Sequence, residues 1–281
     1  ISDRPVVEYC PLHRPTKGDS ADAPSVTQFP MEIINTIGLL KVDFLGLATL
    51  TVMQRAADLI ERYHGVKYDL DTIPTDDPVA FKLLSSGNVQ GVFQVEGPGM
   101  RRILQEMRPS QLEHIIALVA LYRPGPLEMI PNYIRRMHGE EEVTYLDPSL
   151  EPILKETYGI LVYQEQVMRT AIDMAGYTAT DADKLRKAIG KKKKDDLLKQ
   201  REKFVKGAVK KGLDQATPNQ IFDYFEAFAR YGFNKGHAAD YAVVTVQTAW
   251  LKATYPVEYL TALLSVNIGN TEKMAGYVAD C

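Results

Sequence analysis

Four short clusters along the 281-residue chain carry side chains that could do chemistry. In the first, Lys41 and Asp43 stand two residues apart in the apolar run 38–44 (GLLKVDF). This run is predicted to be a buried strand. Side chains alternate along a strand, so both would point the same way. A carboxylate beside a cation at a sheet edge can hold Mg²⁺ against a phosphate. The spacing alone favours the other interpretation, a structural ion pair.

The second cluster is the segment 231–237 (YGFNKGH). Its two glycines let backbone come close to a ligand, and Asn234, Lys235 and His237 supply hydrogen-bond donors. A helix is predicted to begin just after them. The unpaired N–H groups and the dipole of a helix N-terminus favour an anion, so the segment is a candidate phosphate site. A plain helix–loop–helix connection with an exposed lysine is the alternative.

The third cluster is the basic run 184–194 (KLRKAIGKKKK). Helical spacing predicts that Leu185, Ala188 and Ile189 face a core, whereas the basic side chains project outward. Cations ahead of Gly190 suit a helix C-terminus. The run beyond it is a candidate contact for nucleic-acid phosphates. The basic residues of the cluster are Lys184, Arg186, Lys187, Lys191, Lys192, Lys193 and Lys194.

The fourth cluster is Arg123, which is followed by Pro124-Gly125-Pro126 at a predicted helix exit. A guanidinium fixed in this way suits a phosphate, and a buried structural arginine is equally compatible. Asp69 and Asp71 imitate a metal-binding pair, but their acidic, proline-flanked surroundings favour a solvated turn. Walker, GxGxxG and HExxH motifs are absent from the sequence. All histidines except His237 are interpreted as incidental.

Positive charge is concentrated around the third cluster. Residues 184–211 hold 13 Lys or Arg against 3 acidic residues, a net charge of +10, although the whole chain carries −3. Like charges at this density repel unless something neutralises them. A polyanionic partner is therefore favoured, with a solvated helix face as the alternative.

Helical periodicity dominates the chain beyond residue 47. Asp77-Pro78 and Gly87 have the residue types that begin and end a helix, and Thr180 with Asp183 resembles a capping box. Short apolar runs at 38–44, 91–95 and 160–163 are predicted to be strands. Helices are predicted at 47–63, 78–87, up to Met107, 111–122, up to Ala175, up to Ile189, 195–211, 217–232, 238–254, 258–266 and 271–281.

Composition fits an ordinary globular protein, with 45% hydrophobic and 25% charged residues. The longest apolar runs are too short to span a bilayer. Cys10 and Cys281 give neither a disulfide framework nor a zinc spacing, which fits a reducing, intracellular setting. The chain begins with Ile, without a signal-peptide pattern, and we interpret it as a piece of a longer protein.

Together these clusters resemble the alpha-subunit family of bacterial DNA polymerase III, the C-family replicative polymerases. The match follows the chain in order over nearly its whole length. The Phe44-Leu45-Gly46-Leu47 sequence favours the Gram-negative type of this subunit. The stretches that carry the resemblance are 38–47, 91–96, 120–127, 158–168, 186–193, 231–237 and 241–256.

The resemblance implies a mainly α fold. Residues 1–48 would be the C-terminal part of a polymerase-β-like palm, a small α/β piece, and residues 49–281 a helical fingers domain. Asp43 would be the third catalytic aspartate and a Mg²⁺ ligand, with Lys41 contacting phosphate nearby. Nucleotide-binding positions would be Arg123, Arg186, Lys187, Lys191, Asn234, Lys235 and His237. DNA-binding positions would be Lys192, Lys193 and Lys194.

The implied reaction is template-directed deoxynucleotidyl transfer to a primer 3′-hydroxyl by a two-Mg²⁺ mechanism. The family's other two catalytic aspartates form an Asp-x-Asp motif upstream of the third, outside this sequence, so the isolated chain is expected to be inactive. Three residues depart from the family's pattern: Lys187 replaces Arg, Gly236 replaces Ser and Asp240 replaces Ala.

Implied partners are primer–template DNA and deoxynucleoside triphosphates. Through the parent protein, the sliding clamp, the clamp loader and the proofreading exonuclease are implied too. The implied location is the cytoplasm, in association with the nucleoid, and no membrane is expected. The alternative function is a non-catalytic helical nucleic-acid-binding module. An Asp-x-Asp strand in the sequence upstream of Ile1 would favour the polymerase.

Overall fold

The computed structural model describes residues 1–14, 25–44, 46–191, 194–228 and 231–281, with the backbone alone at 191 and 194. The described chain divides into two compact units, Ile1–Ala48 and Thr49–Cys281. Helices dominate the larger unit. The only sheet among the described residues lies in the smaller unit and has two strands. The predicted mainly α fold is therefore confirmed.

The smaller unit is held by very few buried side chains. Strand β1 (Leu12–His13) pairs antiparallel with β2 (Val26–Thr27), and the short helix α1 (Met31–Ile34) follows. Its buried apolar side chains are Cys10, Ile34 and Leu39. The predicted strand at 38–44 is wrong, because residues 39–44 form neither helix nor strand in the described chain.

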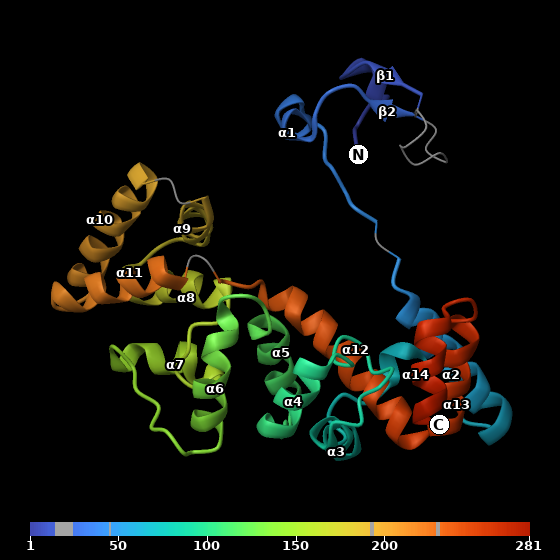
Figure 1. The fold of residues 1–281 in the computed structure, drawn as a ribbon. Helices are drawn as coiled ribbons and strands as arrows, with labels where there is room; N and C mark the ends of the chain where they lie inside the picture. Colours follow the sequence, from blue (N-terminus) through green and yellow to red (C-terminus); the bar gives the residue numbers. More distant parts are fainter. Residues whose placement is uncertain (15–24, 45, 192–193, 229–230) are drawn as a thin grey trace. The chain divides into compact units, whose positions relative to one another are not determined.

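The larger unit is a set of helices joined by loops of varied length (Figure 1). Short 3-10 turns at Leu70–Thr72, Pro126–Met129, Pro148–Leu150 and Lys155–Thr157 complete it. The helices are α2 (Ala48–His64), α3 (Pro78–Ser86), α4 (Pro98–Met107), α5 (Leu112–Leu121), α6 (Ile130–Met137), α7 (Glu151–Leu154), α8 (Gln164–Ala175), α9 (Ala179–Lys191), α10 (Lys194–Lys210), α11 (Ala216–Phe228), α12 (Lys235–Thr254), α13 (Pro256–Val266) and α14 (Thr271–Asp280).

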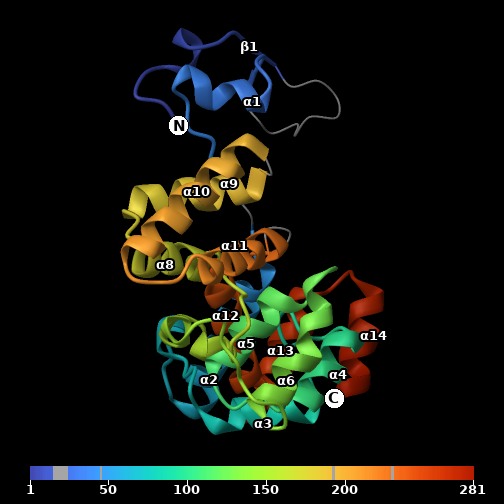
Figure 2. The same cartoon turned by 90° about the vertical axis from the view of Figure 1, so that its left-hand side faces the viewer.

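Two hydrophobic cores fill this unit. The first is built from α2 to α6 with α12 to α14, and the second from α7 to α11. The long helix α12 packs along α5 and α3 and continues to α13, as both views show (Figures 1 and 2). Its buried apolar side chains, from Ala238 in the first turn to Leu251 near the end, belong to the first core.

Helix ends follow local chemistry. At α3 the Asp77 carboxylate accepts from Val79 N–H at 2.9 Å, and Gly87 ends the helix in the left-handed conformation, as predicted. At α9 the predicted capping box is wrong by two residues. Thr178 Oγ1 accepts from Asp181 N–H at 3.2 Å and donates to the Asp181 carboxylate. Thr180 already lies inside the helix.

The other two predicted strands are also wrong, because both apolar runs are buried without forming a sheet. Residues 91–95 form tight turns whose valines are buried. Residues 160–163 carry an apolar run because neighbouring side chains enter different cores. Ile160 and Val162 lie in the first core and Leu161 lies in the second. A single bridge, Tyr163 to Phe233, is the only strand-like pairing described there.

A buried ion pair fixes the far end of α12. The Lys252 side chain is only 5% exposed, and its Nζ lies 2.7 Å from the Asp280 carboxylate of α14. Nζ also donates to the Gln90 carbonyl at 2.9 Å and to the Asn88 amide oxygen at 3.3 Å. A buried ammonium is tolerated only with such partners, so α14 and the 88–90 loop are held to this point.

No described helix has the length and apolar character needed to cross a membrane.

His114, interpreted from the sequence as incidental, is a buried part of the first core. Its Nδ1 accepts from Ser110 N–H at 3.2 Å, and its Nε2 lies 2.9 Å from Tyr158 Oη. Burial lowers the pKa of His114 below its ordinary value of 6.5, and the nearby His138 acts in the same direction. Glu113 opposes this shift by favouring the charged ring. The neutral ring is therefore the form that the fold favours.

This burial predicts a pH-dependent stability. As pH falls below 6.5 the unfolded chain binds a proton at His114 more readily than the folded chain. The free energy of unfolding should therefore be fully present above that pH and decrease below it. His114→Gln should be less stable at pH 7.5 and should flatten the decrease between pH 7.5 and 5.5. Urea unfolding at both pH values measures this. His13→Gln, at an exposed histidine, is the control, and parallel pH profiles in all three proteins would contradict the prediction.

Candidate functional site

Two segments far apart in sequence meet at the bridge between Tyr163 and Phe233. Phe233 N–H donates to the Val162 carbonyl at 3.2 Å, and Gln164 N–H donates to the Phe233 carbonyl at 2.9 Å. Gly232 permits this approach, because a Cβ there would lie 3.2 Å from Gln164 Cγ of the facing segment and 2.7 Å from a ring carbon of Phe228. At Gly236 a Cβ would meet only the side-chain oxygen of Asn234, at 3.3 Å. The second glycine therefore leaves an open approach to the segment.

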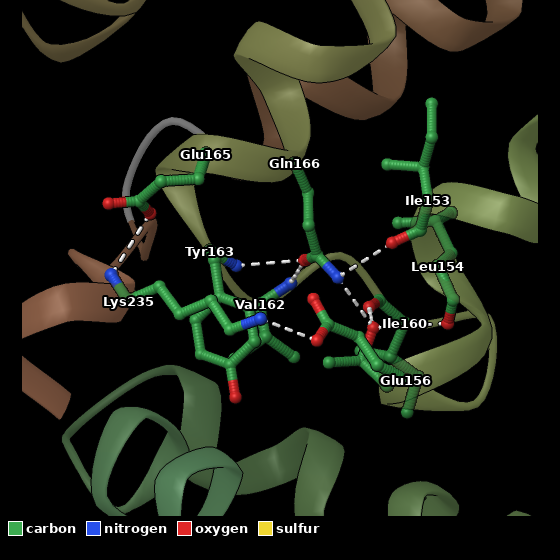
Figure 3. Close-up of polar contacts among 10 residues, drawn as sticks. Ile153, Leu154, Glu156, Ile160, Val162, Tyr163, Glu165, Gln166 and Lys235 are labelled. Atoms are coloured by element: carbon green, nitrogen blue, oxygen red, sulfur yellow. Dashed lines mark hydrogen bonds and ion pairs between the residues drawn. The ribbon is translucent and has the colours of Figure 1, made fainter. Parts of the chain in front are cut away.

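Gln166, in the first turn of α8, holds the loop on one side of this bridge (Figure 3). Its Oε1 accepts from the N–H groups of Val162 and Tyr163, at 2.9 and 3.0 Å. Its Nε2 donates to the Ile153 carbonyl at 3.3 Å and to Thr157 Oγ1 at 2.8 Å. The side chain is buried, so its amide satisfies backbone groups that water does not reach.

The first turn of α12 presents Asn234, Lys235 and His237 together. Asn234 caps the helix, its side-chain oxygen accepting from His237 N–H at 2.8 Å. The His237 ring is exposed and lies between Phe233 and Tyr241, with centroids 5.6 and 4.5 Å away. The predicted cluster 231–237 thus does precede a helix, which begins at Lys235 instead of Ala238.

Two glutamates of the chain bind this turn. Glu165, which neighbours Gln166 on α8, accepts from Asn234 Nδ2 at 2.8 Å and from Lys235 N–H at 2.9 Å. Glu156 lies 2.5 Å from Lys235 Nζ. Figure 3 shows both carboxylates turned toward Lys235. An anion therefore already occupies the N-terminus of α12, where the helix dipole favours one.

Arg123 is half-buried and holds the other side of the bridge. Its Nε donates to the Ala120 carbonyl at 2.8 Å, and one terminal nitrogen donates to the Tyr231 carbonyl at 2.6 Å. The guanidinium lies 4.3 Å from the centre of the Phe233 ring. Burial lowers the pKa of Arg123 below its usual range. These contacts give it the structural place that was the alternative to phosphate binding.

Arg186 and Lys187 share one carboxylate on α9. Asp183 lies 2.8 Å from an Arg186 terminal nitrogen and 2.7 Å from Lys187 Nζ. Lys187, with Arg186 assisting, lowers the pKa of Asp183. Arg186 also donates to the Gln164 side-chain oxygen at 3.2 Å, and Gln164 donates to the Gly232 carbonyl. Arg186 is thereby linked to the bridge, whereas the Lys187 side chain is 59% exposed and contacts Asp183.

Much of the basic window 184–211 is paired within the chain. Lys203 lies 3.0 Å from Asp181, Arg201 binds Asp223 at 2.6 Å, and Lys211 donates to the Asp173 carbonyl at 2.7 Å. Among the described side chains of the window, Lys199, Lys206 and Lys210 are exposed and form no ion pair. Lys192 and Lys193 lie outside the described residues, as do the side chains of Lys191 and Lys194.

Lys41 and Asp43 belong to the smaller unit. Lys41 Nζ lies 3.0 Å from the Asp43 carboxylate, and the two side chains are 47% and 70% exposed. The ion pair therefore forms as its spacing predicts, although the run around it is not a strand. In the described part of the chain, no group of three His, Cys, Asp or Glu side chains could hold a metal ion.

Comparison with known proteins decides the family. Residues 49–212 match the model of the bacterial DNA polymerase III alpha subunit finger domain. The chain belongs to this family. It is 48% identical to DNA polymerase III subunit alpha of Thermus aquaticus and 46% identical to that of Caulobacter vibrioides, with the whole chain covered in both. It spans 23% and 24% of those proteins, about a quarter of their length.

Sequence reasoning missed three side chains that hold this site together, Gln166, Glu165 and Glu156. A signal was present for Gln166. A Gln at the third helical position, directly after an apolar run, is half of a capping box and predicts a side chain that reaches back to the N-cap N–H. Glu165 and Glu156 gave no local signal, because their partners lie 70 and 79 residues further along the chain.

The buried amide of Gln166 yields a prediction for the stability of the finger domain. Gln166→Met keeps the size of the side chain but leaves the N–H groups of Val162 and Tyr163 without their acceptor. Unpaired buried groups are costly, so the free energy of unfolding should fall by about 2–4 kcal/mol. Denaturant unfolding measures the loss. Gln54→Met, at an exposed position of α2, should change it by less than about 0.5 kcal/mol. Equal stabilities of the two variants would contradict the assignment.

Proposed function

We propose that the chain is part of a DNA-directed DNA polymerase, which transfers deoxynucleotides from triphosphates to a primer 3′-hydroxyl. Residues 49–281 would be its fingers and residues 1–48 the end of its palm. The family match of residues 49–212 supports this proposal, as does the similarity of the whole chain to alpha subunits. The substrates would be primer–template DNA and deoxynucleoside triphosphates. The sliding clamp, clamp loader and proofreading exonuclease would bind other parts of the parent protein. That protein would be located in the cytoplasm, in association with the nucleoid.

One observation carries the nucleotide-binding part of the proposal. The bridge between Tyr163 and Phe233 brings four predicted nucleotide-binding residues to one place: Arg186 from α9, and Asn234, Lys235 and His237 from the start of α12. Arg123, two residues after the end of α5, donates to the Tyr231 carbonyl beside the same bridge. Cations, an amide and helical N–H groups together are suited to the phosphates of a triphosphate, and an exposed imidazole is suited to its sugar.

Within this proposal the residues divide the work. Lys235 supplies a charge, the N–H groups of the first turn of α12 supply donors, and Arg186 supplies a planar fork that can contact two oxygens at once. Arg123 positions the loop and makes no phosphate contact. The exposed lysines of α10 would bind template–primer phosphates, in line with the predicted role of the neighbouring Lys192, Lys193 and Lys194.

Asp43 would contribute one carboxylate to a Mg²⁺ site. Carboxylate oxygens are preferred Mg²⁺ ligands, and the exposed Asp43 side chain is accessible to such an ion. One carboxylate beside a lysine does not form a metal site by itself, and the described residues offer no further ligands nearby. The remaining ligands would come from the two aspartates that the family carries upstream. The metal chemistry therefore belongs to the whole subunit.

The role of Asp43 can be tested in the complete subunit. Asp43→Asn keeps the shape but removes the charge that would bind the metal. Loss of a few kcal/mol of transition-state stabilisation corresponds to a fall in turnover of about a hundredfold or more. Primer extension measures turnover, and DNA affinity should change little. Glu32→Gln, an exposed carboxylate of the same unit, serves as the control. Near-normal turnover of Asp43→Asn would leave this residue only its ion pair with Lys41.

The role of Lys235 can be tested separately. If its ammonium binds phosphate, Lys235→Ala in the complete subunit should raise the apparent KM for nucleotide by about tenfold, the typical worth of a charged hydrogen bond. The Tm should stay unchanged, because a partly exposed ion pair adds little stability. His237→Ala should also impair nucleotide kinetics, whereas Lys273→Ala on α14 should not. Unaltered nucleotide kinetics in both site variants would exclude the loop as the nucleotide site.

A further inference from the structure

The groups that the proposed function assigns to phosphate oxygens are already bound to carboxylates of the chain. Lys235 Nζ contacts Glu156 at 2.5 Å, and Lys235 N–H donates to Glu165 at 2.9 Å. Arg186 and Lys187 are bound to Asp183 at 2.8 and 2.7 Å. A triphosphate that approaches this surface therefore meets cations whose charge is largely neutralised, next to three negative charges.

The three carboxylates come from separate elements, so the pairing is not the by-product of a single turn. Glu156 lies in the 3-10 helix Lys155–Thr157, Glu165 in the first turn of α8, and Asp183 in α9. Their binding is weak enough to exchange. The side chains of Glu156, Lys235 and Asp183 are about one-third exposed, at 35%, 37% and 35%. Such water-accessible pairs are typically worth at most about 1 kcal/mol.

The contacts of Glu165 show which carboxylate interactions a bound phosphate would replace. Its carboxylate accepts from the backbone at the start of α12 and from the Asn234 amide, the same donors that a phosphate oxygen would use there. Its neighbour Gln166 fixes the turn from which Glu165 projects, so the Glu165 carboxylate is directed toward these donors in the chain without ligand. A ligand gains these donors only when it displaces Glu165.

We propose that Glu156, Glu165 and Asp183 are internal counterions that determine ligand specificity. Without nucleotide they hold the phosphate-binding groups, and a deoxynucleoside triphosphate replaces them with its own oxygens. The inference rests on the proposed function. A monophosphate can replace one carboxylate, whereas a triphosphate can replace several. The counterions therefore set a threshold that favours the longer phosphate chain.

The test measures equilibrium binding of a deoxynucleoside triphosphate, the monophosphate and the unphosphorylated deoxynucleoside to the complete subunit. Glu165→Gln and Glu156→Gln each remove one competing charge at nearly constant size. Each should tighten triphosphate binding by about two- to fivefold. Monophosphate binding should tighten by a larger factor, which narrows the preference for triphosphate over monophosphate, and deoxynucleoside binding should not change. Glu151→Gln, an exposed glutamate of α7, makes the same charge change away from α12 and should bind like the wild type.

Lys235→Ala, measured beside these variants, distinguishes failure of the counterion proposal from failure of the proposed nucleotide site. If it weakens triphosphate binding while both Gln variants leave it unchanged or weaken it, the counterion proposal is overturned and the nucleotide site stands. If Lys235→Ala and both Gln variants all bind like the wild type, the nucleotide site is wrong and the counterion proposal falls with it. Tightening in Glu151→Gln as well would mean a general charge effect and would also overturn the proposal. A thermal melt confirms that each variant is folded.

Discussion

The candidate site depends on the hydrogen bonds between the buried side-chain amide of Gln166 and the backbone around it. This side chain fixes the N–H groups of Val162 and Tyr163 and anchors the 153–157 turn, so it determines where α8 begins. The start of α8 in turn sets the register in which Tyr163 meets Phe233 and the direction in which Glu165 points. Without this amide, the loop would have to find other partners for polar groups that lie away from water.

The bridge also joins the two cores of the larger unit. Residues 160–162 send side chains alternately into the first and second core, and residues 231–233 run beside this segment into α12. The cores are thus connected by extended backbone pinned by a few hydrogen bonds, together with Arg123 at the Tyr231 carbonyl. Side chains from α8, α9 and α12 can then be placed around one point without belonging to one helix face.

The sequence predicted the helices well because their periodicity and caps are local, as at Asp77 and Gly87. The strand at 38–44 was predicted wrongly because Leu40, Val42 and Phe44 are exposed and most of the run is not buried. Strands at 91–95 and 160–163 were predicted wrongly for another reason, since an apolar run there records burial and not a pairing partner. The window 184–211 was overestimated as a positive surface for a related reason. Its count took in only three acids, whereas Asp181, Asp183 and Asp223, which neutralise Lys203, Lys187 and Arg201, lie outside it. Asp183 pairs with Lys187 within one helical turn and was excluded only by the edge of the window. The pairs Asp181–Lys203 and Asp223–Arg201 join different helices and do not show in a count along the chain.

The buried ammonium of Lys252 has a mechanical consequence for α12. A helix of 20 residues is about 30 Å long. Lys252 binds its far end to α14 and to the 88–90 loop through buried polar contacts whose loss would cost much free energy. These contacts of Lys252 oppose tilting or sliding of the helix at its far end. A rearrangement at Lys235 and His237 would then take place by rotation of their side chains. The backbone of the helix would keep its position during those rotations.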